Sequence, residues 1–556
     1  MRPRNPIANL PTHEVINMPP HMGDQDLFAS DAALREGLER EGAGWAADHV
    51  AAFGRLAGRE ETFEWAEQAN RFGPEIRPFD RHGMRINQVS FHPAYHQLMD
   101  LAIANDLPTF AWNNARPGNH VAHGALSYLL NQAEGGVLCP MSMTYSVVPA
   151  LKTTPAVADE WLPKLLVKEY DPRDIPVAEK TGITMGMFMT EKQGGSDVRT
   201  NTTRAAPAGA ETGPGAGYLL NGHKFFCSAP MCDAFLALAY TDNGISCFLL
   251  PRWRPEGSRN GLFIQRLKDK VGNKSNASSE MELVDAWGVM VGEEGRGVRT
   301  IIEMVNGNRY YCAVSSAALM RQALVQALHY TTHRSAFQRK LIQQPLMRNV
   351  LADMAVEVEA ATALWLRLGR AIGAAAGDDG EAALARIGTA VAKYWICKRA
   401  PNLIFEAMEC HGGPGYVEEC ILPRLYREAP VNSIWEGSGN VVCLDVLRAM
   451  FREEAAIPAF LAEVEQAKGG HALLDRLIAE VQAELADPSD LELRARRVTE
   501  MLALAMQGSL LVRHAPAAVS DAFCRARLGD RWSGAYGTLP RDSDFDAILG
   551  RARGEG

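Results

Sequence analysis

A single carboxylate in a glycine-rich turn is the residue of this sequence whose chemistry is easiest to foresee. Glu436 follows Trp435 in the segment NSIWEGSGNVVCLDVLRAM, residues 432–450. Gly437 and Gly439 allow the backbone to bend sharply at this point. A carboxyl group held beside a packed aromatic ring can act as a base. Taken alone, the segment is equally compatible with a solvated glutamate next to a core tryptophan.

A helix is expected directly after this turn. Asn440 is suited to cap a helix that begins at Val441. Free N–H groups at a helix start favour a phosphate or another electron-rich group. The turn and the helix together therefore predict a base next to an anion-binding helix terminus.

Length and composition are typical of a folded protein with several domains. The 556 residues exceed what one compact core holds, so roughly three or four domains are expected. The apolar fraction of 47 % and the charged fraction of 22 % are those of globular proteins. No apolar run approaches the ~20 residues that cross a bilayer. Prolines occupy the N-terminal region where a signal peptide has its apolar segment, which favours a cytoplasmic protein with no membrane partner.

Several cofactor and metal classes are disfavoured by the sequence. The ten cysteines include no Cys-x-x-Cys pair and are expected to be reduced core thiols. The pairs His92/His96 and His329/His333 have helical spacing but lack the glutamate of H-E-x-x-H, so no metal site is predicted. Neither a G-x-G-x-x-G after a strand nor a Walker sequence occurs. Any nucleotide cofactor must be bound in another way.

The pattern of apolar residues changes along the chain. Residues 30–180 have helical periodicity, and residues 181–297 have the shorter period of strands. Within the strands, Asn221-Gly222 predicts one hairpin turn and Thr241 to Gly244 another. This region is expected to form a compact antiparallel sheet or barrel.

Strong helical periodicity returns after Gly297. The apolar residues of one stripe are spaced alternately by three and four positions, as on one face of a helix. A further helix is expected before this one and another after it, and Gly412-Gly413 is expected to end the later helix. With the helix after the turn, these segments predict a four-helix bundle. The stripe consists of Leu351, Met354, Val358, Ala361, Trp365 and Leu368.

Seven motifs in one order resemble those of the acyl-CoA dehydrogenase flavoproteins and cover about 270 residues. They are MTEKQGGSDV (189–198), NGHKFFCSAP (221–230), DKVGNKSNASSEMELVDAWGVMVGEEGRG (269–297), NRYYCAV (308–314), HRSAFQ (333–338), HGGPGY (411–416) and IWEGSGN (434–440).

The resemblance implies a mainly α fold with a β-barrel middle domain. The expected domains are an N-terminal helical domain (1–180), a β-barrel (181–297), a flavin-binding helical bundle (298–450) and a helical C-terminal extension (451–556). It also implies FAD as cofactor, an acyl-CoA as a possible substrate and a homotetramer, because some cofactor contacts come from a neighbouring subunit.

The resemblance assigns site residues motif by motif. Glu436 would be the catalytic base, and Arg309 would lie near the substrate cleft. Phe226 and Ser228 stand where the family has Trp and Thr, and Gln338 replaces a usual Gly next to Phe337. The residues implied in FAD binding are Met189, Thr190, Gly195, Ser196, Phe226, Cys227, Ser228, Arg334, Phe337, Gly412, Gly413, Ile434, Trp435, Gly437, Ser438 and Asn440.

Within the family, the wording LKDKVGNKSNASSE, LIQQPLMR and RLYREAPVNSIWEGSGNVVCLDVLR is similar to a bacterial subgroup that acts in the response to DNA alkylation. The net charge of −9 argues against a protein that covers nucleic acid with its whole surface, but a local basic face is allowed. Between residues 494 and 531 of the C-terminal extension, seven arginines stand against only Glu500, Asp521 and Asp530, and such a local excess is of the kind that contacts phosphates. The arginines expected to bind double-stranded DNA are Arg448, Arg494, Arg496, Arg497, Arg513, Arg525 and Arg527, with Arg531 in the same region.

Two other functions are compatible with the same motifs. The first is an ordinary metabolic acyl-CoA dehydrogenase that desaturates a short or branched acyl-CoA and does not bind DNA. The second is nitroalkane oxidation, which uses Asp in place of Glu436 and is therefore disfavoured. Because Trp435 is large, weak or absent turnover of long acyl-CoA is expected.

Overall fold

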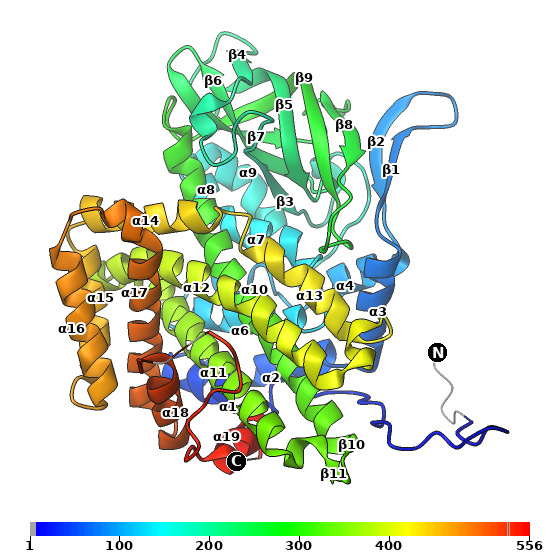
Figure 1. The fold of residues 1–556 in the computed structure, drawn as a ribbon. Helices are drawn as coiled ribbons and strands as arrows, with labels where there is room; N and C mark the ends of the chain where they lie inside the picture. Colours follow the sequence, from blue (N-terminus) through cyan, green and yellow to red (C-terminus); the bar gives the residue numbers. More distant parts are fainter. Residues whose placement is uncertain (1–6, 531, 533, 556) are drawn as a thin grey trace.

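A computed structural model describes residues 7–530, 532 and 534–555 of the chain. Figure 1 shows the strands of the middle of the chain gathered at one end of the molecule and long helices below them. The predicted class, mainly α with a β-barrel in the middle of the chain, is confirmed.

Short helices make up most of the chain before the barrel. They bury their apolar faces against one another and against the long helices of the bundle. The elements are Ala32–Arg40 (α1), Gly44–Ala46 (η1), Ala47–Ala57 (α2), Glu60–Arg71 (α3), Pro93–Ala104 (α4), Phe110–Asn113 (α5), Asn119–Asn131 (α6), Leu138–Ser146 (α7), Val148–Lys152 (α8), Pro155–Leu165 (α9) and Val177–Glu179 (η2).

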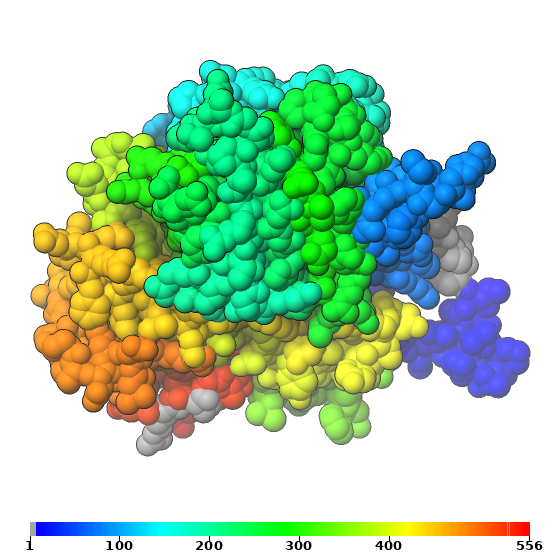
Figure 2. Space-filling view, turned by 90° about the horizontal axis from the view of Figure 1, so that it is seen from above, coloured from blue at the N-terminus to red at the C-terminus, as the bar shows by residue number. Residues whose placement is uncertain are grey.

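A two-stranded hairpin interrupts these helices. The strands β1 (Glu75–Phe79) and β2 (Arg85–Ser90) are antiparallel, and the hairpin projects from the body of the molecule in both views (Figures 1 and 2). The helical pattern of residues 30–180 did not predict it.

The barrel closes because its strands pair in a ring. β6 pairs with β4, then β5, β9 and β7 follow, and β7 returns to β6, while β3 and β8 pair at the sides. The elements are Met185–Phe188 (β3), Val198–Thr200 (η3), Arg204–Pro207 (β4), Gly217–Ser228 (β5), Ala234–Thr241 (β6), Gly244–Pro251 (β7), Leu262–Leu267 (β8) and Ser278–Val291 (β9).

One of the two predicted hairpin turns is confirmed and the other is wrong. β6 and β7 pair from Thr241 and Gly244 onwards, as expected. Asn221 and Gly222 instead lie inside the continuous strand β5, at a register shift against β9. The Asn221 side chain bonds Asp285 of β9, at 2.9 Å, rather than closing a turn.

The bundle is built from long helices that follow the barrel. The apolar stripe predicted along α11 is buried, and α12 ends at His411 with Gly412 as its cap at φ +63°, as expected. The elements are Gly297–His333 (α10), Ser335–Ala336 (β10), Arg339–Lys340 (β11), Leu341–Gln343 (η4), Pro345–Ala374 (α11), Asp379–His411 (α12), Gly413–Tyr416 (η5), Ile421–Asn432 (α13) and Gly439–Arg452 (α14).

The C-terminal extension packs against the bundle. Its long helix α17 contacts α11, α12 and α14, and α14 to α17 lie on the opposite side of the molecule from the β1–β2 hairpin (Figure 1). The elements are Ala456–Val464 (α15), Glu465–Ala467 (η6), Ala472–Ala486 (α16), Leu491–His514 (α17), Ala517–Arg527 (α18) and Phe545–Ala552 (α19).

Other structural expectations can be compared with the described ranges. No helix there has the length and apolar character needed to span a bilayer. The ten cysteines are free thiols, all buried apart from the half-buried Cys420. Within residues 7–530, 532 and 534–555, no cluster of three or more His, Cys, Asp or Glu side chains is arranged to hold a metal ion.

Candidate active site and cofactor site

The turn that carries Glu436 has a sparsely populated backbone conformation. Glu436 has φ +57° and Gly437 has φ +104°, and such left-handed conformations in a non-glycine residue concentrate at functional sites. The turn joins α13 to α14. α14 begins at Gly439 with Ser438 as the capping residue, two residues earlier than predicted, so the expected cap at Asn440 is wrong. The extended backbone of Ser438, at φ −69° and ψ 170°, places it rather than Asn440 at the boundary.

The carboxylate of Glu436 is enclosed. Its Oε1 accepts a hydrogen bond from Asn308 Nδ2 at 3.3 Å, and its Oε2 is buried without a hydrogen-bond partner in the described part of the chain. Burial raises the pKa of Glu436 to about 7, although Arg309, Lys393 and Asn308 each act to lower it. Near neutral pH the carboxyl group can therefore both take and release a proton, as a general base must.

Arg309 is buried and connects the turn to α14. Its Nε donates to the main-chain oxygen of Glu436 at 2.9 Å, and its Nη1 donates to Asp445 Oδ2 at 2.7 Å. Lys393, which is buried in α12, donates to the main-chain oxygen of Gly437. These contacts fix the main chain at Glu436 and at the residue that follows it. The geometry gives Arg309 a positioning role at the turn, and its expected place near the substrate cleft stays a prediction.

Asp445 connects this turn to the body of α14. Burial opposes ionisation of Asp445, but Arg309, Arg386 and Arg448 outweigh it and hold its pKa below the ordinary value. Arg386 binds both carboxylate oxygens, at 2.9 and 3.0 Å, and Arg448 Nη1 binds Oδ1 at 3.0 Å. A buried charge with this many partners is held rigidly, and it holds Arg309 in turn.

The barrel residues predicted to bind the cofactor lie together at the end of β5. The main-chain N–H of Phe225 donates to Thr190 O at 2.8 Å, which joins the segment after β3 to β5. Phe226 is 51 % exposed although it lies in a strand, and Ser228 Oγ is 3.4 Å from Ser278 Oγ on β9.

The remaining barrel residues differ in how accessible they are. Gly195 and Ser196 are exposed in the loop that follows β3, and the main-chain oxygen of Met189 accepts a bond from Asn201 at 2.9 Å. Cys227 is buried in the barrel core, so only its main chain is available to a ligand.

The turn and the barrel meet at Trp435, whose ring packs against the hydrophobic core of the barrel. Ile434, Gly437 and Ser438 therefore adjoin the barrel end, and Ile434 is exposed. The barrel residues and the turn residues predicted for one cofactor are thus brought to one place by the fold.

Four predicted cofactor residues lie elsewhere. Arg334 and Phe337 follow the end of α10, and Gly412 and Gly413 follow the end of α12, where the rings of Tyr330 and His411 are 4.4 Å apart. Arg334 lies about 25 residues beyond Arg309 on α10, or roughly 37 Å along the helix axis. Within one chain, these residues are not brought to Glu436.

The predicted DNA-binding arginines fall into two groups. Arg448, Arg496 and Arg497 are exposed, and Arg496 Nε donates to Asn440 Oδ1 at 2.8 Å. Arg448 also pairs with Asp445 at 3.0 Å. The others are half-buried and engaged in ion pairs, namely Arg494 with Glu484, Arg513 with Glu463, and Arg525 with Asp521 and Asp542.

Arg527 is buried and does not belong to any surface. Its guanidinium binds Asp353 at 2.5 Å and Glu357 at 3.1 Å. Its predicted contact with DNA is therefore wrong, because the charge is already neutralised inside the molecule. Arg531 lies outside the described residues.

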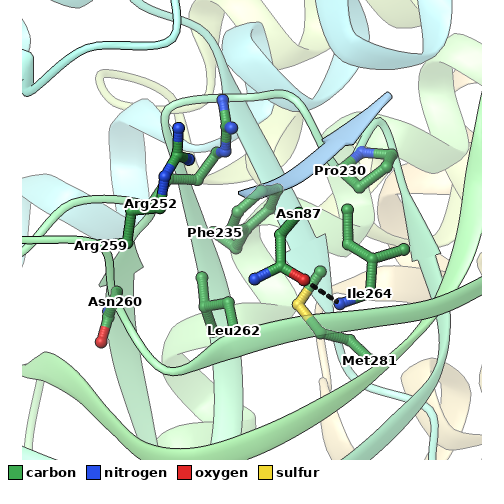
Figure 3. Close-up of a pocket in the computed structure, with 9 residues that line it drawn as sticks. All are labelled: Asn87, Pro230, Phe235, Arg252, Arg259, Asn260, Leu262, Ile264 and Met281. Carbon is green, nitrogen blue, oxygen red and sulfur yellow. Dashed lines mark hydrogen bonds between the residues drawn. The ribbon is translucent and has the colours of Figure 1, made fainter. Parts of the chain in front are cut away.

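A pocket at the barrel is lined by none of the predicted site residues. It is found between the β1–β2 hairpin and the barrel (Figure 3), and Asn87 Oδ1 accepts from the main-chain N–H of Ile264 at 3.2 Å. Its arginines, Arg252 and Arg259, both pair with Asp174 at 2.7 and 3.0 Å. One carboxylate thus serves both arginines, and none of the lining residues belongs to the Glu436 turn.

Sequence reasoning missed several residues of the site. Lys393 and Asp445 each interrupt an apolar helical run, TAVAKYWIC and VVCLDVL, and a charge in such a run is the signal that could have found them. Asn308 precedes Arg309 and was passed over as part of its motif. Lys398 lies beside the start of α14, where an added Cβ at Gly439 would lie 3.1 Å from its Cε.

The residues present fit a flavin. They offer a flat exposed ring at Phe226, hydroxyl groups at Thr190 and Ser228, and a helix N-terminus at Ser438 whose side chain forms no cap bond with a described residue. Beside them, Glu436 Oε2, Asn308 Oδ1 and Trp435 Nε1 are buried without partners among the residues described. Such atoms are costly unless a ligand or solvent meets them.

Comparisons with known proteins agree with this arrangement. The model "Adaptive response protein AidB N-terminal domain" matches residues 17–172, "Acyl-CoA dehydrogenase, middle domain" matches 186–286, and "Acyl-CoA dehydrogenase, C-terminal domain" matches 295–451. AidB of Escherichia coli (strain K12) is 44 % identical over 94 % of this chain and 95 % of its own. Acyl-CoA dehydrogenase family member 11 of Caenorhabditis elegans is 31 % identical over 81 % of this chain and 77 % of its own.

Solved structures show the same fold. The crystal structure of C. elegans ACDH-11 in complex with C11-CoA superposes with a TM-score of 0.85 over 96 % of each chain, at 27 % identity. An acyl-CoA dehydrogenase of Bacillus anthracis, solved with FAD, has a TM-score of 0.61 over 78 % of this chain and 80 % of its own, at 17 % identity. FAD is the cofactor of this family. The chain belongs to the acyl-CoA dehydrogenase family of flavoproteins, in its AidB-like branch.

Proposed function

We propose that this flavoprotein binds double-stranded DNA and acts in the response to DNA alkylation damage, inactivating alkylating agents and retaining weak acyl-CoA dehydrogenase activity. The observation that carries the proposal is a basic surface around α14, the helix that begins at the Glu436 turn. The likeness to E. coli AidB supports the same assignment.

The proposed chemistry rests on Glu436 as the base. FAD, when bound by the barrel end and the turn, supplies a hydride acceptor. Glu436 takes the α-proton of a thioester, and its burial makes it a stronger base than an exposed glutamate. Arg309 and Lys393 hold the main chain of the turn, so the carboxylate keeps its place while its charge changes.

We call the exposed cations of this region the α14 basic surface. Arg448 and Arg452 are four residues apart on α14, so they share one face of the helix. Arg496 and Lys398 flank the start of the same helix, and Arg497 is exposed on α17. Arginine and lysine side chains on one face are suited to the phosphates of a duplex.

The test is DNA affinity as a function of salt concentration. The double variant Arg496→Ala/Arg497→Ala should bind a fluorescent duplex more weakly, and the salt dependence of its affinity should fall by about two phosphate contacts. The matched control is Arg513→Ala/Arg525→Ala, which removes arginines already paired with Glu463, Asp521 and Asp542. Affinity that is insensitive to salt, or that falls equally in both double variants, would count against the proposed surface.

An ordinary metabolic acyl-CoA dehydrogenase is the second candidate. It is favoured by the buried Glu436 and by the relative solved with C11-CoA. Rapid bleaching of the flavin by a short acyl-CoA, together with no retention of DNA, would select this function over the first.

We further propose that the chain is a cytoplasmic homotetramer with four domains, 1–180, 181–297, 298–450 and 451–556. Arg334, Phe337, Gly412 and Gly413 would then serve the FAD of a neighbouring subunit, since the fold does not bring them to Glu436 within one chain. Phe337 is 93 % exposed in the single chain, as a residue awaiting a partner would be.

A further inference from the structure

The wall next to the proposed base is rich in unpaired hydrogen-bond acceptors. Asn308 Nδ2 lies 3.3 Å from Glu436 Oε1, so the two side chains are adjacent. Asn308 Oδ1 and Glu436 Oε2 are both buried, and neither has a partner in the described ranges. Asn308 is 3 % exposed, so its free oxygen is enclosed within the site. A buried acceptor in this state requires a donor from whatever occupies the site.

The polar character continues along α10 away from Glu436. Asn308, Tyr311 and Ser315 follow one another at helical spacing on one face. Tyr311 Oη and Ser315 Oγ both donate to Asn131 Oδ1 of α6, at 3.1 and 2.8 Å. Asn432, the last residue of α13, donates to Ser315 Oγ at 3.1 Å. These polar groups bond to one another, so the acceptor of Asn308 is the member of the series that is left without a partner among the described residues.

The free acceptors decide which substituents the site tolerates. Placing a methylene group against Asn308 Oδ1 would leave it without a partner, at a cost of about 1–3 kcal/mol. A hydroxyl or amino group in that position would remove the cost. Sites built to bond a polar hydrogen reject the analogue that lacks it far more strongly than apolar pockets reject an extra methyl group.

We propose that Asn308 is a specificity-determining residue, and that the substrate carries a hydrogen-bond donor, a hydroxyl or amino group, beside the carbon that loses its proton to Glu436. The inference rests on the proposed role of Glu436 and names the substrate class for that site. Short acyl groups bearing such a substituent are preferred, and unsubstituted straight chains are disfavoured.

The experiment compares the binding of two probes to the FAD-loaded protein. Butyryl-CoA and 3-hydroxybutyryl-CoA, the latter as each enantiomer, are titrated calorimetrically, which requires no turnover. In the wild-type protein one enantiomer of the hydroxy thioester should bind at least about tenfold more tightly. In Asn308→Leu the preference should vanish or reverse, and Asn308→Ala serves as a second variant if leucine prevents folding.

A matched control is Asn432→Leu, which removes a buried asparagine of the same polar group that does not contact Glu436. This variant should keep the preference for the hydroxy thioester. Equal affinity for the two probes in the wild-type protein, or a preference that survives in both Asn308 variants, overturns the inference while leaving DNA binding untouched. If neither thioester binds, the acyl-CoA assignment under the proposed function falls, and this inference falls with it.

Discussion

At the scale of single residues, Glu436 combines a strained backbone with an enclosed carboxylate. Its φ of +57° costs free energy that the surrounding contacts must offset. Arg309 and Lys393 provide those contacts through main-chain oxygens, so the side chain itself stays free to exchange a proton. The raised pKa follows from the burial of this side chain, and the main-chain contacts hold the turn that carries it.

The first prediction concerns Glu436→Gln. Turnover of any acyl-CoA should be lost while FAD remains bound, because the amide cannot accept the proton. The difference in the free energy of unfolding between the wild-type protein and Glu436→Gln should also depend on pH. The pKa of Glu436 is raised from 4.5 to about 7 in the folded state, so the wild-type protein loses stability relative to Glu436→Gln as pH rises from 4.5 through 7. The loss should reach about 3 kcal/mol and then stay constant.

Urea unfolding of the two proteins at pH 5, 6, 7 and 8 measures this difference. The wild-type and variant curves should separate up to pH 7 and run parallel above it. A separation that does not change with pH would show that Glu436 ionises as an exposed glutamate does.

The second prediction separates two of the three arginines that bind Asp445, Arg309 and Arg386. Arg309 is the leading favourable charge for the ionised form of Glu436, so Arg309→Met should raise the pKa of the base above 7. The pH at which activity is half-maximal should move upward, and activity at pH 7 should fall about tenfold for each unit of that movement. Arg386→Met is the control, because Arg386 binds Asp445 without touching the turn. The pH profile of Arg386→Met should match that of the wild type. If the pH of half-maximal activity moves equally in both variants, the effect belongs to Asp445 rather than to Arg309.

At the scale of elements, the regular parts of the fold were predictable from sequence and the exceptions have local causes. The stripe on α11, the stop at Gly412 and the β6–β7 turn all follow from periodicity and turn chemistry. Asn221-Gly222 has the same turn chemistry but lies within β5. A tertiary contact decides this, because Thr203, just before β4, packs directly against Gly222.

Gly222→Ala should therefore destabilise the barrel. An added Cβ would lie 2.4 Å from Thr203 Oγ1 and 2.8 Å from Thr203 Cα, and the second of these is backbone that cannot move aside. The expected loss is about 1–3 kcal/mol in the free energy of unfolding. Gly209→Ala, where an added Cβ would meet no described atom within 4 Å, should be nearly neutral in the same thermal or urea melt. Equal stability of the two variants would refute this account of Gly222.

Site residues could be predicted where a sequence motif identifies them. They could not be predicted where tertiary contacts decide what a residue does. Glu436 and Trp435 could be identified as site residues because they stand in a recognisable glycine-rich turn. The division of the C-terminal arginines could not, because Arg527 and Arg497 look alike in sequence. Arg527 is buried in ion pairs with Asp353 and Glu357 of α11, whereas Arg497 is exposed on α17. Only the packing of α17 and α18 on the bundle distinguishes them.

At the scale of the whole molecule, the proposed cofactor residues are split between two ends of the bundle. One set lies at the barrel end, and Arg334, Phe337, Gly412 and Gly413 lie where α10 and α12 end. The bundle helices are so long that the two sets of residues cannot meet at one site within a single chain. A second copy, arranged so that its far end meets the first chain's barrel, would complete two equivalent sites through one self-complementary contact.

Phe337→Asp tests this arrangement. Phe337 is 93 % exposed at the tip of the β10–β11 hairpin, so a charge there costs the single chain little but cannot be buried at an interface without a partner. Mass photometry should show a fall in the tetramer fraction, and the FAD content after dialysis should fall with it, because assembly and cofactor binding stabilise each other by mass action. Leu493→Asp is the control, since Leu493 is 87 % exposed on α17 of the C-terminal extension. If Phe337→Asp remains tetrameric and retains its flavin as Leu493→Asp does, each chain must bind its cofactor alone, and the four distant residues need another role.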